Sequence, residues 1–242
     1  MKPCLIKQPA GIGDVFFCQK IARVMLEKGY DVFWPLRSDI AWIRDYIPDI
    51  IFPTLDDQFP MKDIYDRAGG CVIEDTAAFI SPATANFTHN DGGNMTSKYS
   101  MVGIDISDWA DYFKYNRNTE RENELYYNVL GLNDNSEYVY VNSFYNTDNY
   151  ESNIFVNQEY EYPVIENQIV EGYSLFDWCK VLENAKEIHT TPTSVCYLLE
   201  TIDTKGKLVY TCREEYQYSE HLPLFRKKIL WKLVTGETKW VN

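Results

Sequence analysis

Short apolar runs alternate with helical patterns through the first third of the chain. The apolar runs resemble buried strands, and the segments between them repeat apolar residues at spacings of three and four. Because parallel strands need long crossover connections, this order predicts a βαβαβ unit around a mainly parallel sheet. The predicted elements are a strand at residues 3–7, a helix at 14–28, a strand at 31–35, a helix at 39–46 and a strand at 50–52.

The rest of the chain predicts a bridge of helices followed by a second region of strands and helices. A strand at residues 71–74 and a loop at 81–94, too long to be a mere connection, precede the helical bridge at 95–132. Ser174 and Asp177 form a start resembling a capping box, with Asp in place of Glu. The elements predicted beyond the bridge are strands at residues 138–142, 153–157, 162–170, 187–189 and 207–210, and helices at 175–184, 193–202 and 225–234.

This order of elements predicts an α/β protein of two Rossmann-like halves, joined by the helical bridge, with a cleft between them. We expect residues 1–132 to form an N-terminal domain and residues 133–242 a C-terminal domain. In open α/β sheets, ligands bind beyond the carboxyl ends of the strands. The turns that follow the strands are therefore the places where chemistry is expected.

Composition narrows the expected partners and compartment. The chain has 242 residues and a net charge of −13, and its only dense basic cluster, residues 226–228, is expected on the exposed face of the last helix. Duplex nucleic acid is therefore not an expected partner. No apolar run approaches the roughly 20 residues that span a bilayer, and the start of the chain lacks a secretory signal pattern. The six cysteines form no C-x-x-C pair, which is typical of reduced thiols. We expect a cytoplasmic protein.

The first turn of interest follows the first predicted strand, in the sequence KQPAGIGDVFF. Gly11 and Gly13 allow a ligand or another part of the backbone to approach closely, and Asp14 stands where the helix is expected to begin. One interpretation is an ordinary turn in which Asp14 caps the helix. The other is a substrate site in which the two glycines admit the ligand and the carboxylate of Asp14 acts on it.

A second turn, in the sequence EIHTTPTS, follows a predicted strand in the other half of the chain. Its hydroxyl groups, together with the free N–H groups at the start of the next helix, favour an anion site of the kind that holds a diphosphate. The alternative is a plain Thr or Ser cap of that helix. The candidate residues are His189, Thr190, Thr191, Thr193 and Ser194.

Three further residues are weaker candidates for contact with substrate. Lys98 and Tyr99 follow the long loop, where they could reach an acceptor or phosphates, although a lysine on an exposed helix is commoner. Ser143 follows the strand predicted at residues 138–142, where polar residues are also common for structural reasons. No D-x-D triplet ends a strand, and the acids at residues 56–57 and 105–111 are interpreted as solvated loop and cap residues, so no metal site is expected.

Taken together, G-x-G-D after the first strand and the segment SLFDWCKVLENAKEIHTTPTS resemble the GT-B glycosyltransferases, specifically the heptosyltransferase-like family nine. In that family the acid of the first turn is the catalytic base, which corresponds to Asp14, and the second segment, here residues 174–194, holds the nucleotide diphosphate. The family has Asp-Ser-Gly and then Pro-x-His at the end of this segment. This chain has Thr191-Pro192-Thr193 and then Ser194-Val195-Cys196, without the histidine.

The resemblance implies transfer of a sugar from a nucleotide-diphosphate sugar to an acceptor hydroxyl of a glycan or small molecule, with inversion and without a metal or other cofactor. The N-terminal domain would hold the acceptor and the C-terminal domain the nucleotide sugar. One alternative is an inactive nucleotide or nucleotide-sugar binding protein of the same fold. Another is an interaction module whose many aromatic residues bind a protein, although aromatic residues more often fill a core.

Overall fold

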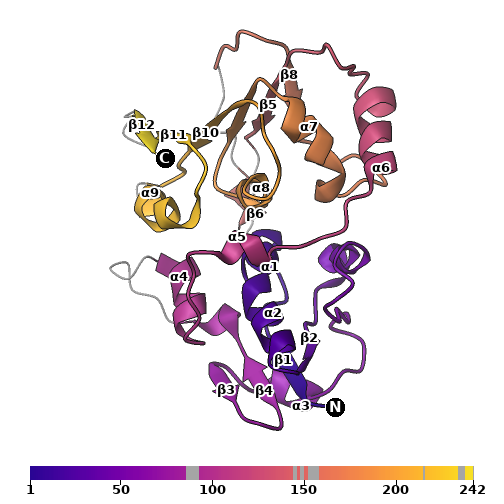
Figure 1. Cartoon of the computed structure of the whole chain (residues 1–242), viewed down its shortest axis with the longest axis vertical. Helices are drawn as coiled ribbons and strands as arrows, with labels where there is room; N and C mark the ends of the chain where they lie inside the picture. Colours follow the sequence, from indigo (N-terminus) through magenta and orange to yellow (C-terminus); the bar gives the residue numbers. More distant parts are fainter. Residues whose placement is uncertain are drawn as a thin grey trace. The chain divides into compact units, whose positions relative to one another are not determined.

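The computed structural model describes residues 1–85, 93–143, 146–147, 150–151, 158–214, 216–233 and 238–241. The chain forms two compact units, Met1–Asn116 and Arg117–Asn242, which can be followed by colour in Figure 1. The boundary therefore falls at residue 117 rather than at residue 133. Part of the predicted bridge thus belongs to the C-terminal unit.

The N-terminal unit is built on a four-stranded sheet of order β2-β1-β4-β3. Strand β1 (Pro3–Ile6) pairs in parallel with β2 (Asp31–Phe33) and with β4 (Ala78–Ile80), whereas β3 (Cys71–Ile73) runs antiparallel to β4. Leu5 lies between Phe33 and Phe79 in the register. These three side chains share one face of the sheet and pack in a buried cluster.

Helices complete the N-terminal unit on both sides of the buried strands. Helix α2 (Gln19–Glu27) packs against β2, beside which Figure 1 draws it, and against α5 (Trp109–Tyr112). Strands covered in this way read as continuous apolar runs, which explains the run of buried residues in β1. The helices are α1 (Ile12–Phe17), α2 (Gln19–Glu27), the 3₁₀ helix η1 (Ser38–Asp45), α3 (Lys62–Tyr65), the 3₁₀ turn η2 (Pro82–Thr84), α4 (Gly93–Ser100) and α5 (Trp109–Tyr112).

Several predicted elements of this unit differ in the structure. The helix predicted at residues 14–28 begins at Ile12 and is interrupted at Cys18, so Gly11 and not Asp14 is the N-cap residue. The strand predicted at 50–52 is reduced to a parallel bridge between Ile51 and Phe33. Strand β4 was not predicted, and it forms a hairpin with β3. Of the predicted loop at 81–94, residues 86–92 lie outside the described residues.

The C-terminal unit contains a six-stranded sheet of order β12-β11-β10-β9-β5-β8. The strands from β8 to β11 pair in parallel, and β12 is antiparallel at the edge. The predicted strand at 153–157 lies outside the described residues. The strands of the sheet are β5 (Val139–Asn142), β8 (Val164–Glu166), β9 (Glu187–Thr190), β10 (Lys207–Thr211), β11 (Ile229–Lys232) and β12 (Thr238–Val241), and β6 (Asn146–Thr147) and β7 (Tyr150–Glu151) form a separate hairpin.

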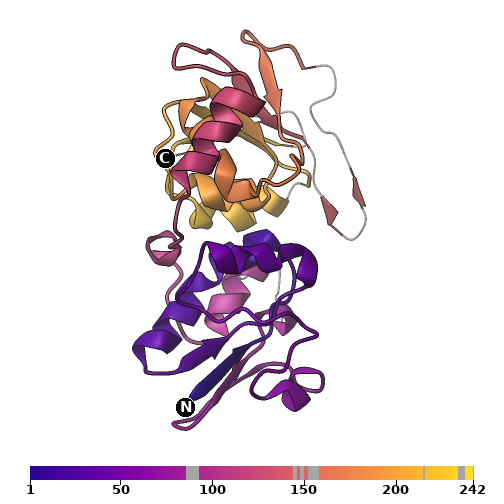
Figure 2. The same cartoon turned by 90° about the vertical axis from the view of Figure 1, so that its right-hand side faces the viewer.

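Helices α6 and α7 lie side by side over this sheet (Figure 2). Trp178, at the start of α7, contacts the ring of Tyr140 with 5.9 Å between the ring centroids. The predicted capping box is confirmed, since Ser174 and Asp177 make both of its hydrogen bonds. The helices are α6 (Thr119–Asn123), the π-helix η3 (Glu124–Val129), the 3₁₀ helix η4 (Leu175–Trp178), α7 (Cys179–Asn184), α8 (Ser194–Leu199), α9 (Tyr216–His221) and the 3₁₀ turn η5 (Leu222–Leu224).

The predicted last helix, at residues 225–234, is wrong. Burial alternates along Ile229–Lys232, as it does in a strand, and these residues form β11 inside the sheet. The basic cluster at 226–228 precedes that strand and is not on a helix. The backbone N–H groups of Arg226 and Lys227 donate to the Glu200 carboxylate.

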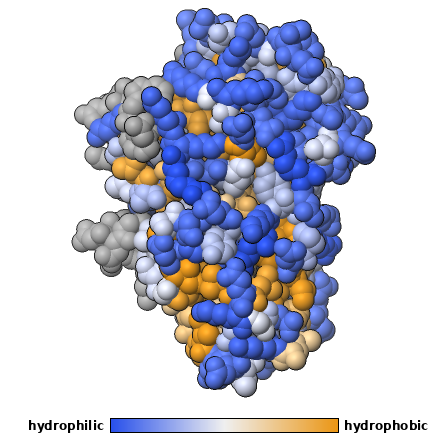
Figure 3. Space-filling model, viewed as in Figure 1, coloured by the Kyte–Doolittle hydropathy of each residue, from blue (hydrophilic) through white to orange (hydrophobic). Residues whose placement is uncertain are grey.

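Other features of the chain concern its surface and its thiols. Figure 3 shows hydrophobic side chains gathered on one face of the N-terminal unit, and the exposed large apolar residues of that unit include Val72 and Ile73 on edge strand β3.

All six cysteines are free thiols, and all of them except Cys71 are buried. No helix in the described part of the chain has the length and apolar character needed to cross a membrane.

Candidate functional site

The first candidate turn connects β1 to α1 and places Asp14 in the first turn of that helix. The Nζ of Lys98, on α4, lies 2.6 Å from Asp14 Oδ1. The Lys98 side chain is only 4% exposed, whereas the Asp14 side chain is 28% exposed. The carboxylate is thus anchored from inside the protein and still accessible to a ligand from outside. Lys98 is therefore not a lysine on an exposed helix.

Gln8 holds the other side of the Lys98 ammonium group. Lys98 Nζ donates to Gln8 Oε1 at 2.9 Å, and Gln8 Nε2 donates to the Ala10 carbonyl at 2.8 Å. The Gln8 backbone carbonyl accepts a hydrogen bond of 2.8 Å from Trp34 Nε1. Gln8 is buried. This chain of contacts fixes Lys98 between Gln8 and Asp14.

Gly11 is required by the shape of this turn. Its φ is +83°, a conformation that is strained for other residues, and a Cβ built on it would lie 2.2 Å from Asp14 Oδ2. Gly13 lies within α1. Burial raises the pKa of the neighbouring Cys18 thiol to about 12, so that this thiol stays neutral. Asp14, whose side chain is 28% exposed, is therefore the acidic group of this turn that a substrate can contact.

Tyr99 follows Lys98 in α4 but belongs to the core. Its side chain is buried, its hydroxyl donates to the Phe17 carbonyl, and its ring meets the Phe17 ring edge-on with 4.9 Å between centroids. A hydroxyl engaged in this way inside the core is not available to a ligand. We therefore assign Tyr99 a packing role rather than the predicted contact with substrate.

The second candidate turn lies at the carboxyl ends of β5 and β9, which pair in parallel with Asn142 opposite Thr190. Asn142 Nδ2 donates to both Thr190 Oγ1 and Thr193 Oγ1 at 2.9 Å. Asn142 Oδ1 accepts from Asn167 Nδ2, also at 2.9 Å. Four polar side chains, located at the ends of three strands, thus form one hydrogen-bond network. Asn142 and Asn167 are not among the residues predicted from the sequence, although a polar residue at the end of the buried strand β5 is a signal.

The remaining residues of this turn differ in how they are held. Thr191 is fully buried, and its Oγ1 has no hydrogen-bond partner within the described residues. Thr193 is the N-cap of α8 but makes no capping hydrogen bond with its side chain, so the plain-cap interpretation fails for it. Ser194 begins α8, and Ser143 directly follows Asn142 at the same sheet edge. Both serines are partly exposed.

His189 is buried in β9, and both nitrogens of its ring face other side chains of the protein. Its Nε2 lies 2.7 Å from Glu187 Oε2, and its Nδ1 lies 3.2 Å from Gln158 Nε2. The ring of Tyr160 meets the imidazole edge-on. Burial lowers the pKa of His189, which favours the neutral ring. We assign His189 a structural role and not the predicted contact with a diphosphate.

The acids interpreted as loop and cap residues have local roles. Asp57 is exposed and accepts the Thr54 N–H at 2.7 Å, which lowers its pKa. Hydrogen bonds from Ser107 lower the pKa of Asp105 in the same way. Asp108 pairs with Lys20. Among the described residues, no three or more His, Cys, Asp and Glu side chains are grouped so that they could hold a metal ion.

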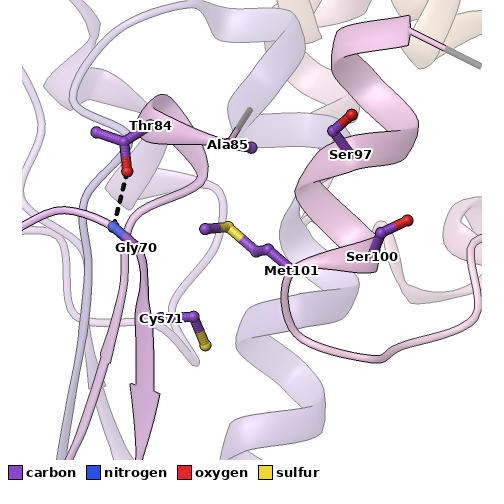
Figure 4. A pocket seen from close by; sticks show the side chains of 7 residues that line it. All are labelled: Gly70, Cys71, Thr84, Ala85, Ser97, Ser100 and Met101. Atoms are coloured by element: carbon purple, nitrogen blue, oxygen red, sulfur yellow. Dashed lines mark hydrogen bonds between the residues drawn. The ribbon is translucent and has the colours of Figure 1, made fainter. Parts of the chain in front are cut away.

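A pocket of about 760 Å³ adjoins α4 on the side of Ser97, Ser100 and Met101. Figure 4 shows Met101 extending between α4 and Cys71, while the Ser100 hydroxyl points away from Cys71. Thr84 Oγ1 accepts from the Gly70 N–H at 2.9 Å. None of the lining residues carries a charged side chain, and burial raises the pKa of the Cys71 thiol. The lining that the described residues give this pocket is therefore uncharged.

Comparison with known proteins supports the fold. No protein-family model matches the sequence, and no curated protein sequence matches it. The structure is similar to the glycosyl transferase family 9 protein from Veillonella parvula, with a TM-score of 0.55 and 8% identity, over 95% of this chain and 86% of that chain. The fold of this chain is therefore similar to the fold of that protein.

A second similar structure is the iron-containing dodecameric glycosyltransferase TibC from enterotoxigenic E. coli. Here the TM-score is 0.50 and the identity 12%, over 87% of this chain and 58% of that chain. At sequence identities of 8% and 12%, the similarity to these two structures is a similarity of fold. It confirms the predicted resemblance and the α/β class with parallel sheets.

Proposed function

We propose that the protein is a GT-B glycosyltransferase that moves a sugar from a nucleotide-diphosphate sugar to a hydroxyl group of a glycan or small-molecule acceptor. The observation that carries the proposal is Asp14, an accessible carboxylate anchored after the first strand of a chain with this fold. A family 9 fold alone would leave the activity open. An acid held at this position, where ligands of such sheets bind, provides a base for the reaction.

In the proposed reaction, Asp14 takes the proton of the acceptor hydroxyl as its oxygen attacks the anomeric carbon of the donor. The bond from that carbon to the diphosphate breaks as the new bond forms, so the configuration is inverted. The described lining of the pocket beside α4 carries no charged side chain, which fits an acceptor that is itself uncharged at the bound group. Catalysis by one well-placed base contributes about 10²–10⁴-fold to the rate.

The donor would bind at the carboxyl edge of the C-terminal sheet. Thr193, Ser194 and Ser143 offer partly exposed hydroxyls there, and the hydroxyl of the buried Thr191 is unpartnered within the described residues. Asn142 holds Thr190 and Thr193 in place. Hydrogen bonds from these groups would stabilise the charge on the leaving diphosphate, in a mechanism without a metal ion or other cofactor. The free thiols agree with a reducing, cytoplasmic setting.

The substitution Asp14→Asn tests this proposal. The amide keeps the shape of the side chain but cannot accept the proton, so we expect turnover to fall about 10²–10⁴-fold. Donor binding should persist because the donor contacts lie on other residues. The donor is first identified by screening nucleotide sugars for an increase in melting temperature, and turnover is then measured with candidate acceptors. A folded variant that binds donor and turns over at the wild-type rate would show that Asp14 is not the base.

One observation favours a second function, a nucleotide or nucleotide-sugar binding protein without transfer. The second turn lacks the acid and the later histidine of the family segment, and His189 cannot replace them because it is buried against Glu187 and Gln158. For this function, a nucleoside diphosphate would raise the melting temperature of the wild type. Neither hydrolysis nor transfer would then be detected with any nucleotide sugar that binds.

A further inference from the structure

We propose that Lys98 and Gln8 are positioning residues that hold the Asp14 carboxylate in place for proton transfer. This inference rests on the proposed function, because it concerns the same base. Neither residue is assigned to touch the sugar or the diphosphate. Lys98 therefore acts through Asp14, and Gln8 acts through Lys98.

The burial of Lys98 is the first argument. A lysine is rarely buried unless its ammonium group is paired, and the Lys98 side chain is only 4% exposed. Its two partners shown here are Asp14 Oδ1 at 2.6 Å and Gln8 Oε1 at 2.9 Å. The charge is thus directed at one oxygen of an accessible carboxylate. A lysine needed only for solubility would point to solvent.

The asymmetry of the Asp14 carboxylate is the second argument. Oδ1 faces Lys98, whereas Oδ2 lies over the Cα of Gly11, where any Cβ would come within 2.2 Å of it. The ion pair with Lys98 holds one oxygen of the carboxylate, and the absence of a side chain at Gly11 leaves room for the other. A base that is fixed in this way loses little orientational freedom when the acceptor hydroxyl arrives.

Gln8 provides the third argument, since its own orientation is determined. Its Nε2 donates to the Ala10 carbonyl, which leaves its Oε1 to accept from Lys98. Its backbone is tied to the indole of Trp34. The chain of contacts therefore runs from the core to the carboxylate through groups with a single arrangement of donors and acceptors.

The chain offers a matched control in Lys20 on α2. Lys20 is also buried in the N-terminal unit, and its ammonium group also pairs with an aspartate, Asp108. Its hydrogen bonds go to Asp108 and to the Asp105 carbonyl. Replacing Lys20 removes a buried, paired lysine from the same unit without removing a partner of Asp14. Any effect common to both lysines is an effect on folding.

The experiment compares Lys98→Ala, Gln8→Leu and Lys20→Ala with the wild type in steady-state transfer assays. A misplaced base costs about 10²-fold for a displacement of 1 Å, so Lys98→Ala should lower kcat by about that factor and leave the donor KM within about twofold. Gln8→Leu should lower kcat by roughly tenfold. Lys20→Ala should leave both constants unchanged. Methylammonium chloride should restore part of kcat to Lys98→Ala, relative to equal sodium chloride, but not to Asp14→Asn.

A measurement without turnover keeps the inference testable if Lys98→Ala does not fold. The lysine ammonium resonances of the folded wild type, labelled with ¹⁵N, should include one that Asp14→Asn and Gln8→Leu both shift and Lys20→Ala does not. Absence of such a resonance refutes the contact. Normal kcat in Lys98→Ala with an active wild type refutes only the positioning role. A wild type without transfer refutes the proposed function and, with it, the catalytic meaning of the pair.

Discussion

Replacing Gly11 by alanine separates the fold of the first turn from its chemistry, because a second glycine provides a control. Gly11 has a φ of +83° and Gly29, at the turn after α2, has a φ of +80°. A side chain in a left-handed conformation costs roughly 1–2 kcal/mol at either position. In a chain of this length that cost lowers the melting temperature by about 2–8 °C.

The two positions differ in what the new methyl group would meet. At Gly29 nothing lies within 4 Å, whereas at Gly11 the new Cβ would lie 2.2 Å from Asp14 Oδ2. Contacts below 3.0 Å are essentially never seen, so the carboxylate must move by about 1 Å, a misplacement that commonly costs about 10²-fold in rate. Only atoms of the Asp14 side chain, and none of the backbone, meet the new methyl group, so this movement adds little to the loss of stability.

The assay measures melting temperature, donor affinity and turnover for Gly11→Ala, Gly29→Ala and the wild type. We expect both variants to melt at similarly reduced temperatures and to bind donor normally, but only Gly11→Ala to lose turnover by about 10²-fold. Equal turnover in the two variants would refute the reasoning, because the displaced carboxylate would then have no part in the reaction. A large loss in Gly29→Ala would show that backbone strain alone lowers turnover.

Two further predictions concern the C-terminal unit. Thr193→Ala combined with Ser194→Ala should weaken the binding of a nucleoside diphosphate in calorimetric titration, with each lost hydrogen bond to the charged group costing roughly 1.5–3 kcal/mol; unchanged affinity in the folded double variant would remove this turn from the site. Burial lowers the pKa of His221 to about 4 from 6.5. The neutral imidazole therefore contributes fully to the free energy of unfolding above pH 6.5, and up to about 3 kcal/mol of this is lost as the pH falls toward 4. Thermal melts across this pH range should show a smaller loss for His221→Gln, and parallel curves would contradict the assignment.

The sequence predicted the elements whose signals are local. Strand β1, the capping box at Ser174 and the helix after Thr193 follow from patterns of a few residues, and they appear in the structure. The helix predicted at residues 225–234 includes the residues of β11, because a short apolar run fits either a helix or a strand. Residues 229–232 form a strand because they pair with β10 and β12. No local pattern in the sequence reveals this pairing.

The candidate site could be predicted only in part for the same reason. Asp14 and the hydroxyls of the second turn stand beside glycine or strand signals in the sequence. The contact of Lys98 with Gln8 joins residues 90 positions apart, and its existence depends on how α4 packs. Asn142 and Asn167 likewise meet only because β5 and β8 pair in parallel. The Tyr99 hydroxyl and His189 Nδ1 meet Phe17 and Gln158, partners distant in sequence that no local pattern reveals.

The network of Asn142, Asn167, Thr190 and Thr193 has a consequence for the thermodynamics of binding. Its hydrogen bonds already fix these side chains before any ligand is present, so their rotamer entropy is lost on folding and not on association. A diphosphate meeting this edge would therefore bind with a smaller entropic penalty than it would at a loop of free hydroxyls. Opening the network with Asn142→Ala should then make binding less favourable chiefly through entropy, even though Asn142 itself need not touch the ligand.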